Sequence, residues 1–385
     1  ALPLCLHHEP VGINAEFIGE YSERAAYIQH GMAVNAQLAD EGFVLLKNDG
    51  TLPLDDGARI SIVGKASIDL ARGGAGSGAG SVSSGVTSID LQKSLTDVGF
   101  EVNPVTTAFY NSSASGSGRT NGNNNWQGNS EVTIGETDIE KVRAASGLLD
   151  SFDEYNDAAI QVITREGSEG CDVKTCNTHD SIKTHTSSKK ISDKHALELS
   201  DNEQALFDEL HEHFDHIIIV INSSNIFECD QFEKDDQVAG VLWIGNPGDV
   251  GPGAVGRILK GDVNPSGRTV DTWTRDFTKD PSFQNFSDNA QTNEVTLSNG
   301  DIYYAPQDTM FAEDGAPMLS FGTDKNYKAH NAPRWDSARG GQEAQVVSGG
   351  INGVKPASYV SYEEGIYVDY RYYETRYADM AKEDK

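Results

Sequence analysis

Three short runs of this chain lack polar alternation, and they constrain the fold more than any other feature. Arg59–Gly64, Ile217–Asn222 and Gly240–Gly245 are short, rich in β-branched or apolar residues, and bounded by turn-forming residues. A strand without alternation is buried on both faces, which is typical of parallel sheets. With helical segments between the runs, the sequence predicts an α/β fold, a mostly parallel sheet flanked by helices in an α/β sandwich.

Capping signals mark the helices that should cover this sheet. Ser200 and Glu203 have the spacing of a capping box, and Ser88 can cap an earlier helix. Gly99 and Gly261 can end helices in the left-handed conformation. The predicted helices lie at about 22–40 and 253–260, and around Leu91–Val98 and Leu206–Phe214.

The chain divides into three regions by composition. Residues 1–40 form an irregular lead-in and a helix, residues 41–275 carry the helix–strand alternation, and residues 276–385 lose it in an acidic, aromatic extension. Residues 111–130 are Ser-, Asn- and Gly-rich and predict an exposed loop, because they cannot bury enough apolar area to offset ordering. Residues 171–195, rich in Lys, Thr, His and Ser, predict a second mobile insertion.

Net charge and hydropathy exclude two kinds of partner. The formal charge is −29, which repels the phosphates of nucleic acid and anionic membrane surfaces, so we expect no nucleic acid and no membrane as partners. No apolar run approaches the roughly 20 residues that span a bilayer. The charge itself is explained by solubility or by adaptation to a salty medium, and it says little about a substrate.

The number and spacing of the cysteines indicate the redox compartment of the protein. Cys5, Cys171, Cys176 and Cys229 are too few and too scattered for a disulfide framework. A bridge between the second and third could close a small loop, but reduced thiols are favoured. This favours a cytoplasmic protein, with secretion left open.

Two motifs resemble a nucleotide-binding loop and a metal site, and the residues around them do not favour either function. Gly73–Gly80 has a dinucleotide-like glycine spacing after a strand, but Lys65–Arg72 intervenes where a phosphate-binding turn would join strand directly to helix. His211, His213 and His216 resemble a metal set, yet positions two apart on a helix point to different faces. We therefore predict no cofactor and no metal, with a nucleotide-binding domain kept as a distant alternative.

Four motifs, in order, resemble one family. They are Glu41–Leu54 (EGFVLLKNDGTLPL), Gly73–Gly78, Gly261–Arg268 (GDVNPSGR) and Glu364–Tyr373 (EGIYVDYRYY). Together they cover roughly residues 26–377 and are similar to the sandwich domain of family 3 glycoside hydrolases, of the β-glucosidase and β-xylosidase type. The resemblance implies that residues 41–275 are this α/β sandwich domain.

The resemblance also implies a missing part. Family 3 enzymes carry their nucleophile, an aspartate often followed by Trp, on a (β/α)₈ barrel, and this chain has no Ser-Asp-Trp motif. The sandwich begins about 40 residues from the start, which resembles the subgroup of inverted domain order. There the sandwich precedes a fibronectin-like domain, towards which 276–385 would lead, and then the barrel. We expect the barrel in the same gene or as a second chain, and leave a homo-oligomer open.

The acid/base residue of this family is a glutamate on a loop of the sandwich domain. In relatives the loop resembles Ser-Gly-Glu-Gly-Tyr-Asp, and here 165–172 read Arg-Glu-Gly-Ser-Glu-Gly-Cys-Asp, which puts the acid/base on Glu169 with Glu166 as the alternative. Flanking glycines let such a loop swing, and partial burial can keep the carboxyl protonated. In the family the glycine loop approaches the sugar, so Arg72 and Ser77 line the substrate site, or equally form only a tight turn.

The expected activity follows from this resemblance. It is the sandwich part of a retaining exo-β-glycosidase that removes terminal β-linked glucose or xylose from oligosaccharides or glycosides. Such enzymes need a nucleophilic carboxylate and a protonated one about 5–5.5 Å apart. The alternative is a non-catalytic carbohydrate-binding or scaffold domain descended from such an enzyme.

Overall fold

The computed structural model describes residues 23–73, 86–119, 133–167, 180, 194–280, 366 and 369–377, and the short strands between 286 and 360. Within these residues no helix is both long and apolar enough to cross a lipid bilayer.

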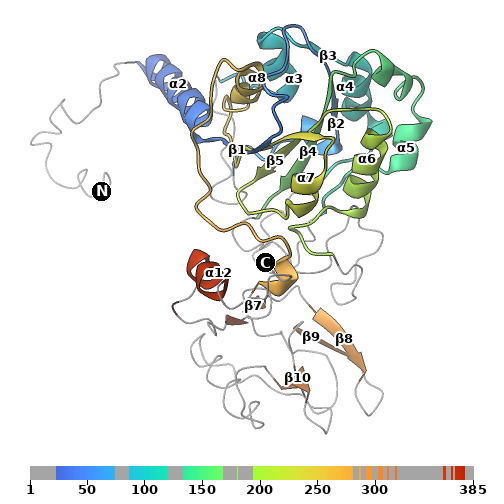
Figure 1. Cartoon of the computed structure of the whole chain (residues 1–385), viewed down its shortest axis with the longest axis vertical. Helices are drawn as coiled ribbons and strands as arrows, with labels where there is room; N and C mark the ends of the chain where they lie inside the picture. Colours follow the sequence, from blue (N-terminus) through green and yellow to red (C-terminus); the bar gives the residue numbers. More distant parts are fainter. Residues whose placement is uncertain are drawn as a thin grey trace, which may run out of the picture.

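A six-stranded sheet forms the centre of the fold (Figure 1). Its spatial order is β1-β6-β5-β4-β2-β3, and all neighbours are parallel except the edge strand β1, which runs antiparallel to β6. This confirms the predicted mostly parallel α/β sheet. The strands are β1 (Val44–Asn48), β2 (Arg59–Val63), β3 (Glu101–Val102), β4 (Ala158–Arg165), β5 (Ile217–Ser223) and β6 (Val238–Trp243).

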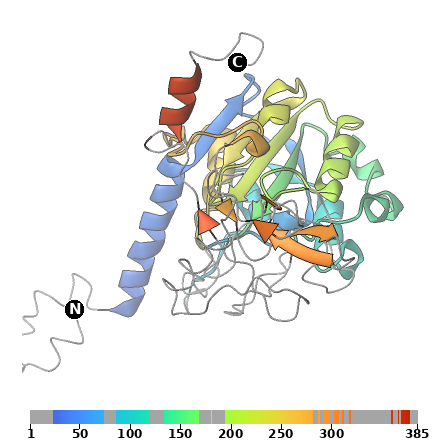
Figure 2. The same cartoon turned by 90° about the horizontal axis from the view of Figure 1, so that it is seen from below.

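Helices cover both faces of the sheet, as the unbroken burial of its central strands requires (Figures 1 and 2). One face carries α3 and α8, with α2 beside them and extending away from the body of the domain. The other carries α4 to α7. The bounds are α2 (Arg24–Gly42), α3 (Leu91–Asp97), α4 (Pro104–Asn111), α5 (Ile139–Ala144), α6 (Asp201–His211), α7 (Asp230–Lys234) and α8 (Gly253–Lys260), with 3₁₀ turns at Lys65–Ile68, Ser113–Ser115, Asp150–Asp153 and Phe277–Lys279.

The period of two along the strands separates two apolar cores. In β5, Ile218 and Val220 face the core under α3 and α8, whereas Ile217, Ile219 and Ile221 face the core under α4 to α7. All five side chains are 0% exposed. A strand buried on both faces in this way explains the absence of polar alternation in its sequence.

Several local predictions are confirmed, and others need correction. The capping box of Ser200 is present, and Gly261 ends α8 in the left-handed conformation at φ 84°. The cap of α3 is Asp90, whose side chain accepts from the backbone N–H of Lys93, because α3 begins two residues later than a Ser88 cap requires. The predicted strand 240–245 is observed two residues earlier.

The two predicted insertions are not uniformly exposed. Ser115, in the predicted loop 111–130, is 1% exposed because a 3₁₀ turn packs it under α4, and residues 120–130 lie outside the described residues. In the second insertion, His195 is 4% exposed and Asp180 is partly buried, so the segment does not lie wholly on the surface at these two points. Both have hydrogen-bond partners on other parts of the chain that a composition argument cannot detect.

The C-terminal extension contains short antiparallel pairs and one helix. Asp369, just before the helix, accepts a hydrogen bond from the backbone N–H of Thr272 at 2.7 Å, and the hydroxyl of Tyr373 donates to Asp280. These contacts join the end of the matched motif to the segment that follows α8. The elements are β7 (Phe286–Ser287), β8 (Thr292–Thr296), β9 (Ile302–Pro306), β10 (Met310–Phe311), β11 (Pro317–Met318), β12 (Tyr359–Val360) and α12 (Tyr370–Tyr377).

Candidate functional site

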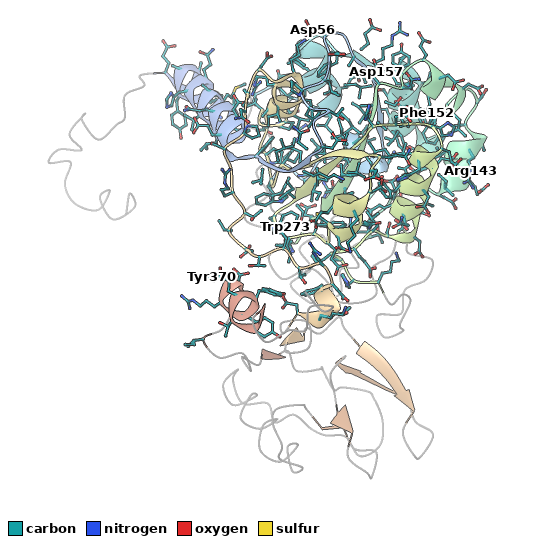
Figure 3. The ribbon with its side chains drawn as sticks, viewed as in Figure 1. Asp56, Arg143, Phe152, Asp157, Trp273 and Tyr370 are labelled. Atoms are coloured by element: carbon teal, nitrogen blue, oxygen red, sulfur yellow. The ribbon has the colours of Figure 1, made fainter. Side chains whose placement is uncertain are left out.

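The strand order selects one edge of the sheet for a ligand. The chain passes from β2 outward to β3 and then returns to β4 on the other side of β2, so the order reverses between β2 and β4. Ligands of open α/β sheets bind outside the carboxyl ends of the strands at such a reversal. In Figure 3 Asp157, next to the amino end of β4, lies at the top, and Trp273, which contacts Trp243 at the carboxyl end of β6, lies on the opposite side. The candidate site is therefore on the lower side of the sheet in that view.

The guanidinium of Arg119 joins the two loops that leave β2 and β4 at this point. Its Nε lies 3.2 Å from the carboxylate of Asp69, on the loop after β2, and its Nη1 donates to the carboxylate of Glu166, just after β4. The side chains of Arg119 and Glu166 are 9% and 13% exposed. Glu166, the alternative acid/base candidate, is thus an ion-paired residue at the root of its loop.

Arg72, predicted to line a sugar site, donates to three backbone carbonyls. Its Nη1 lies 2.9 Å from the oxygen of Asp249 and 3.4 Å from that of Gly248, and its Nη2 lies 2.9 Å from that of Ile89. In return the N–H of Gly248 donates to the oxygen of Arg72 at 2.7 Å. These bonds tie the chain just before the glycine loop to the loop after β6. Substrate binding by Arg72 stays a prediction.

Asn222, near the end of β5, ties three strand ends together. Its Oδ1 accepts from the N–H of Ala71 at 2.6 Å and from the hydroxyl of Thr164 at 3.3 Å. Its Nδ2 donates to the oxygens of Ala71 at 3.0 Å and Gly245 at 2.6 Å. One buried amide therefore fixes the loops after β2 and β6 to the end of β4.

A buried carboxyl group supports the first turn after β2. Both oxygens of Glu136 accept from the N–H of Lys65 at 2.9 Å, and Oε1 also accepts from the N–H of Thr137 at 2.6 Å. Burial raises the pKa of Glu136 to about 8, so this carboxyl group is mostly protonated at neutral pH. Burial lowers the pKa of Lys65, whose Nζ donates to the oxygen of Tyr110 at 2.7 Å and the hydroxyl of Ser115 at 2.8 Å. These groups are fully engaged and hold the turn in place.

A second buried network lies at the carboxyl end of β4. The guanidinium of Arg165 forms a two-pronged ion pair with Glu203 of α6, at 2.8 and 2.6 Å, and both side chains are at most 2% exposed. The same helix terminus contacts Asp180, whose two oxygens accept from the hydroxyl of Ser200 at 2.6 Å and the N–H of Asn202 at 3.0 Å. Sequence reasoning missed this network, since no local spacing relates residues 165, 180 and 203.

The two predicted site residues that matter most lie outside the described residues. These are Glu169, the predicted acid/base, and Ser77 of the glycine loop. Arg72 and Glu166, which precede them in the described chain, are both engaged at the roots of their loops.

The histidines weighed as metal ligands have separate partners. His211 contacts Asp235 at 2.8 Å through Nε2, whereas His213 lies 3.5 Å from Glu209. Among the described residues no cluster of His, Cys, Asp or Glu could hold a metal ion. Cys229 is a free thiol whose pKa burial raises to about 12, which leaves it unreactive, and the other three cysteines lie outside the described residues.

These features define a class: a doubly wound α/β domain in which several loops meet at the strand-order reversal. The Glycosyl hydrolase family 3 C-terminal domain matches residues 43–370, most of the chain. The chain therefore belongs to glycoside hydrolase family 3 and carries its C-terminal domain.

Relatives and solved structures agree with this assignment. Beta-glucosidase A of Butyrivibrio fibrisolvens is 29% identical over 281 residues, 70% of this chain and 32% of the relative. The beta-glucosidase of Ruminococcus albus is 28% identical over 306 residues, 78% of this chain and 28% of the relative. The structure of a beta-glucosidase from Paenibacillus barengoltzii is similar in fold, with a TM-score of 0.50 and 22% identity over 73% of this chain and 30% of that one. The chain spans about a third of the length of these proteins.

Proposed function

We propose that this chain is the acid/base-bearing part of a retaining exo-β-glycosidase that releases terminal glucose or xylose from β-linked oligosaccharides or glycosides. Glu169 gives a proton to the departing oxygen and later takes one from water. The nucleophilic carboxylate comes from a barrel domain, encoded in the same gene or in a second chain. The relatives named as β-glucosidases and β-xylosidases support the substrate class.

One observation carries the proposal. The segment 166–172, with its Glu-Gly-x-Asp sequence, leaves β4 at the point where the strand order reverses, next to the loop that leads from β2 into the glycines. Both glycine-containing segments therefore leave the sheet at the edge where open α/β sheets bind their ligands. Ion pairing through Arg119 commits Glu166 to a structural contact, which favours Glu169 as the proton donor.

Leaving-group chemistry tests this role in the complete enzyme. Glu169→Gln should slow hydrolysis of methyl β-glucoside by about 100- to 10,000-fold, because a poor leaving group needs the proton. Hydrolysis of dinitrophenyl β-glucoside should be slowed far less at the glycosylation step, which pre-steady-state release of the phenol measures.

Glu166→Gln is the matched control. It removes an ion pair at the root of the loop and should slow both substrates by similar factors. A leaving-group effect in Glu166→Gln and none in Glu169→Gln would move the acid/base to Glu166. A complete protein that binds saccharides and hydrolyses none would instead be the non-catalytic domain.

A further inference from the structure

Helix α2 carries an exposed apolar stripe along most of its length. Tyr27, Gly31, Val34 and Leu38 form it, and at 3.6 residues per turn they lie within about 60° of the helix circumference. The side chains of Tyr27, Val34 and Leu38 are 65%, 39% and 66% exposed. A contiguous apolar stripe on the surface of a helix marks a contact surface.

A different face of α2 holds the helix on its own domain. The side-chain amide of Asn35 donates to the oxygen of Pro247 at 2.9 Å and accepts from the N–H of Val250 at 3.2 Å, both in the loop after β6. The carboxylate of Asp40 lies 2.6 Å from the guanidinium of Arg257 on α8. Figure 2 shows the rest of the helix standing away from the body of the domain. The domain therefore fixes the position of the stripe and leaves it uncovered.

The composition of α2 is that of a buried helix. Residues 25–39 contain no Asp, Glu, Lys or Arg, in a chain of which 23% of the residues are charged and whose net charge is −29. Surface helices normally carry charges on their exposed face, whereas charge is depleted at the centre of protein interfaces. Exposed charges occur only at the two ends of the helix, at Glu23 and Arg24 and at Glu41.

The stripe fits a second copy of itself in the antiparallel orientation. When Tyr27 of one copy lies opposite Leu38 of the other, Gly31 lies opposite Val34, because both pairs share one centre between residues 32 and 33. A two-fold axis through that centre repeats each contact, as in most homodimers. The dipoles of two antiparallel helices also oppose each other, which is favourable.

Charge complementarity selects the same orientation and the same register. Arg24 of one copy then lies level with Glu41 of the other, at both ends of the pair. The carboxylate of Glu41 accepts from the side chain of Gln37 at 2.9 Å on the exposed surface, which leaves acceptor positions for a guanidinium. In a parallel pair the two arginines would lie side by side, and so would the two glutamates.

Exposed apolar residues continue beyond the C-terminal end of α2. The N–H of Ser266 donates to the oxygen of Glu41 at 3.2 Å, and the N–H of Thr272 donates to Asp369, so residues 266–272 connect α2 with the start of α12. Interfaces of standard size bury about 800 Å² per partner, which is more than one helix face supplies. The first turn of the second copy's α2 would lie next to this segment, whose exposed residues, with those beside α12, are Val270 (86%), Ile366 (72%) and Tyr370 (52%).

We propose that two copies of this chain associate through their α2 helices, packed antiparallel, with Tyr27, Val34 and Leu38 at the centre of the contact and an Arg24–Glu41 ion pair at each end. The apolar stripe supplies the affinity, and the charges set the orientation.

Sedimentation of the complete protein over a range of concentrations tests the pairing. Leu38→Glu places two carboxylates in the apolar contact and should raise the dissociation constant of the dimer by about 100-fold or more. The matched control is Ile68→Glu, whose side chain is 38% exposed on the 3₁₀ turn after β2, outside this surface, and which should change the constant by less than about twofold. Both positions are exposed, so both variants should keep the circular dichroism of the wild type.

A charge exchange tests the orientation. Arg24→Glu and Glu41→Arg each place like charges together at both ends of the pair and should weaken the dimer by about 10-fold. The double variant restores opposite charges and should return to within about twofold of wild type.

The alternatives give distinct outcomes. A protein that stays monomeric, a dimer that Leu38→Glu does not weaken, or a double variant as weak as the single ones would overturn the proposal. A monomeric protein that Leu38→Glu makes less stable in urea would show that another part of the same polypeptide covers the stripe, and would overturn it as well.

Discussion

The two faces of the sheet are packed by different kinds of residue. Under α3 and α8 the helices approach each other closely through small residues: a Cβ added to Gly256 would lie 2.0 Å from the backbone oxygen of Ser94. Under α4 to α7 the core is aromatic, with Phe152 packed edge-on against Phe214 at 4.9 Å, and it includes the buried ion pair of Arg165 and Glu203. Figure 3 shows Phe152 and Arg143 together on this second side.

The difference shows which side of the sheet contains buried charged and ionisable groups. Buried ion pairs and protonated carboxyl groups are costly to desolvate, and apolar replacements of similar volume often stabilise as well or better. On the face of α4 to α7 they lie at the carboxyl ends of β2 and β4, from which the site loops leave. One face therefore supplies tight packing, and the other supplies specific anchors for loops.

The largest expected effect is the loss of stability when the buried ion pair on the face of α4 to α7 is broken. Glu203→Ala leaves Arg165 with two buried N–H groups unpaired and should lower the free energy of unfolding by about 3–5 kcal/mol. Urea denaturation of the chain measures it. Lys93→Ala, in the exposed pair of Lys93 with Asp97 on α3, is the control and should cost less than about 0.5 kcal/mol. Equal losses for the two variants would mean that the buried pair has no special weight.

A somewhat smaller loss of stability is expected from a substitution on the other face, where α3 and α8 are in close contact. Gly256→Ala must push α8 away from α3, because its new methyl group meets backbone, and should cost about 3 kcal/mol. Gly31→Ala, in the middle of α2 with nothing within 4 Å of its Cβ, should instead stabilise by about 0.5–1 kcal/mol. Thermal unfolding of both variants checks the signs. A neutral Gly256→Ala would contradict tight contact between the two helices.

The last expected effect is a pH dependence of stability that comes from the face of α4 to α7. Glu136 keeps its proton in the folded state up to about pH 8 and loses it near its ordinary pKa of 4.5 when unfolded. Stability should therefore fall as pH rises from about 4.5 to 8 and not change further through this group. Glu136→Gln, which keeps an acceptor for Lys65, should remove most of this fall, measured by denaturation at pH 5 and pH 8.5. An unchanged slope would mean that Glu136 is ionised in the fold.

The sheet was predictable from sequence because a strand that is buried on both faces has an almost continuous run of apolar residues. Ile217–Ser223 has no polar residue in its first five positions, and the Ser200–Glu203 spacing sets the start of α6. Small elements were missed: β3 has two residues, too few for any periodicity, and α5 has six. The boundary of β6 moved because Gly240, taken as a strand end, lies inside it, where its Cα faces the side chain of Leu52.

Only the site residues that belong to a sequence motif could be predicted. The Glu-Gly-x-Asp spacing singles out Glu169, but the partners of Glu166 and Arg165 at the end of β4 come from positions 119 and 203, which the strand order brings together. Asp180 in particular sits in a stretch of Lys, Thr and Ser that composition marks as a surface insertion. Its partial burial follows from two hydrogen bonds to α6, which no pattern within the stretch encodes.

The borders of the sheet have a consequence for how this domain meets others. On one side β3 offers only two residues, and on the other β1 is interrupted between Leu45 and Lys47, with the Lys47 ammonium bound to the carbonyls of Phe232, Glu233 and Asp235. Short or irregular outer strands give a foreign strand little to extend. Any stable association of this sheet domain, with a barrel or with a second copy, must therefore be made by side chains on its helices and loops, and its main-chain ladder stays closed to polymerisation.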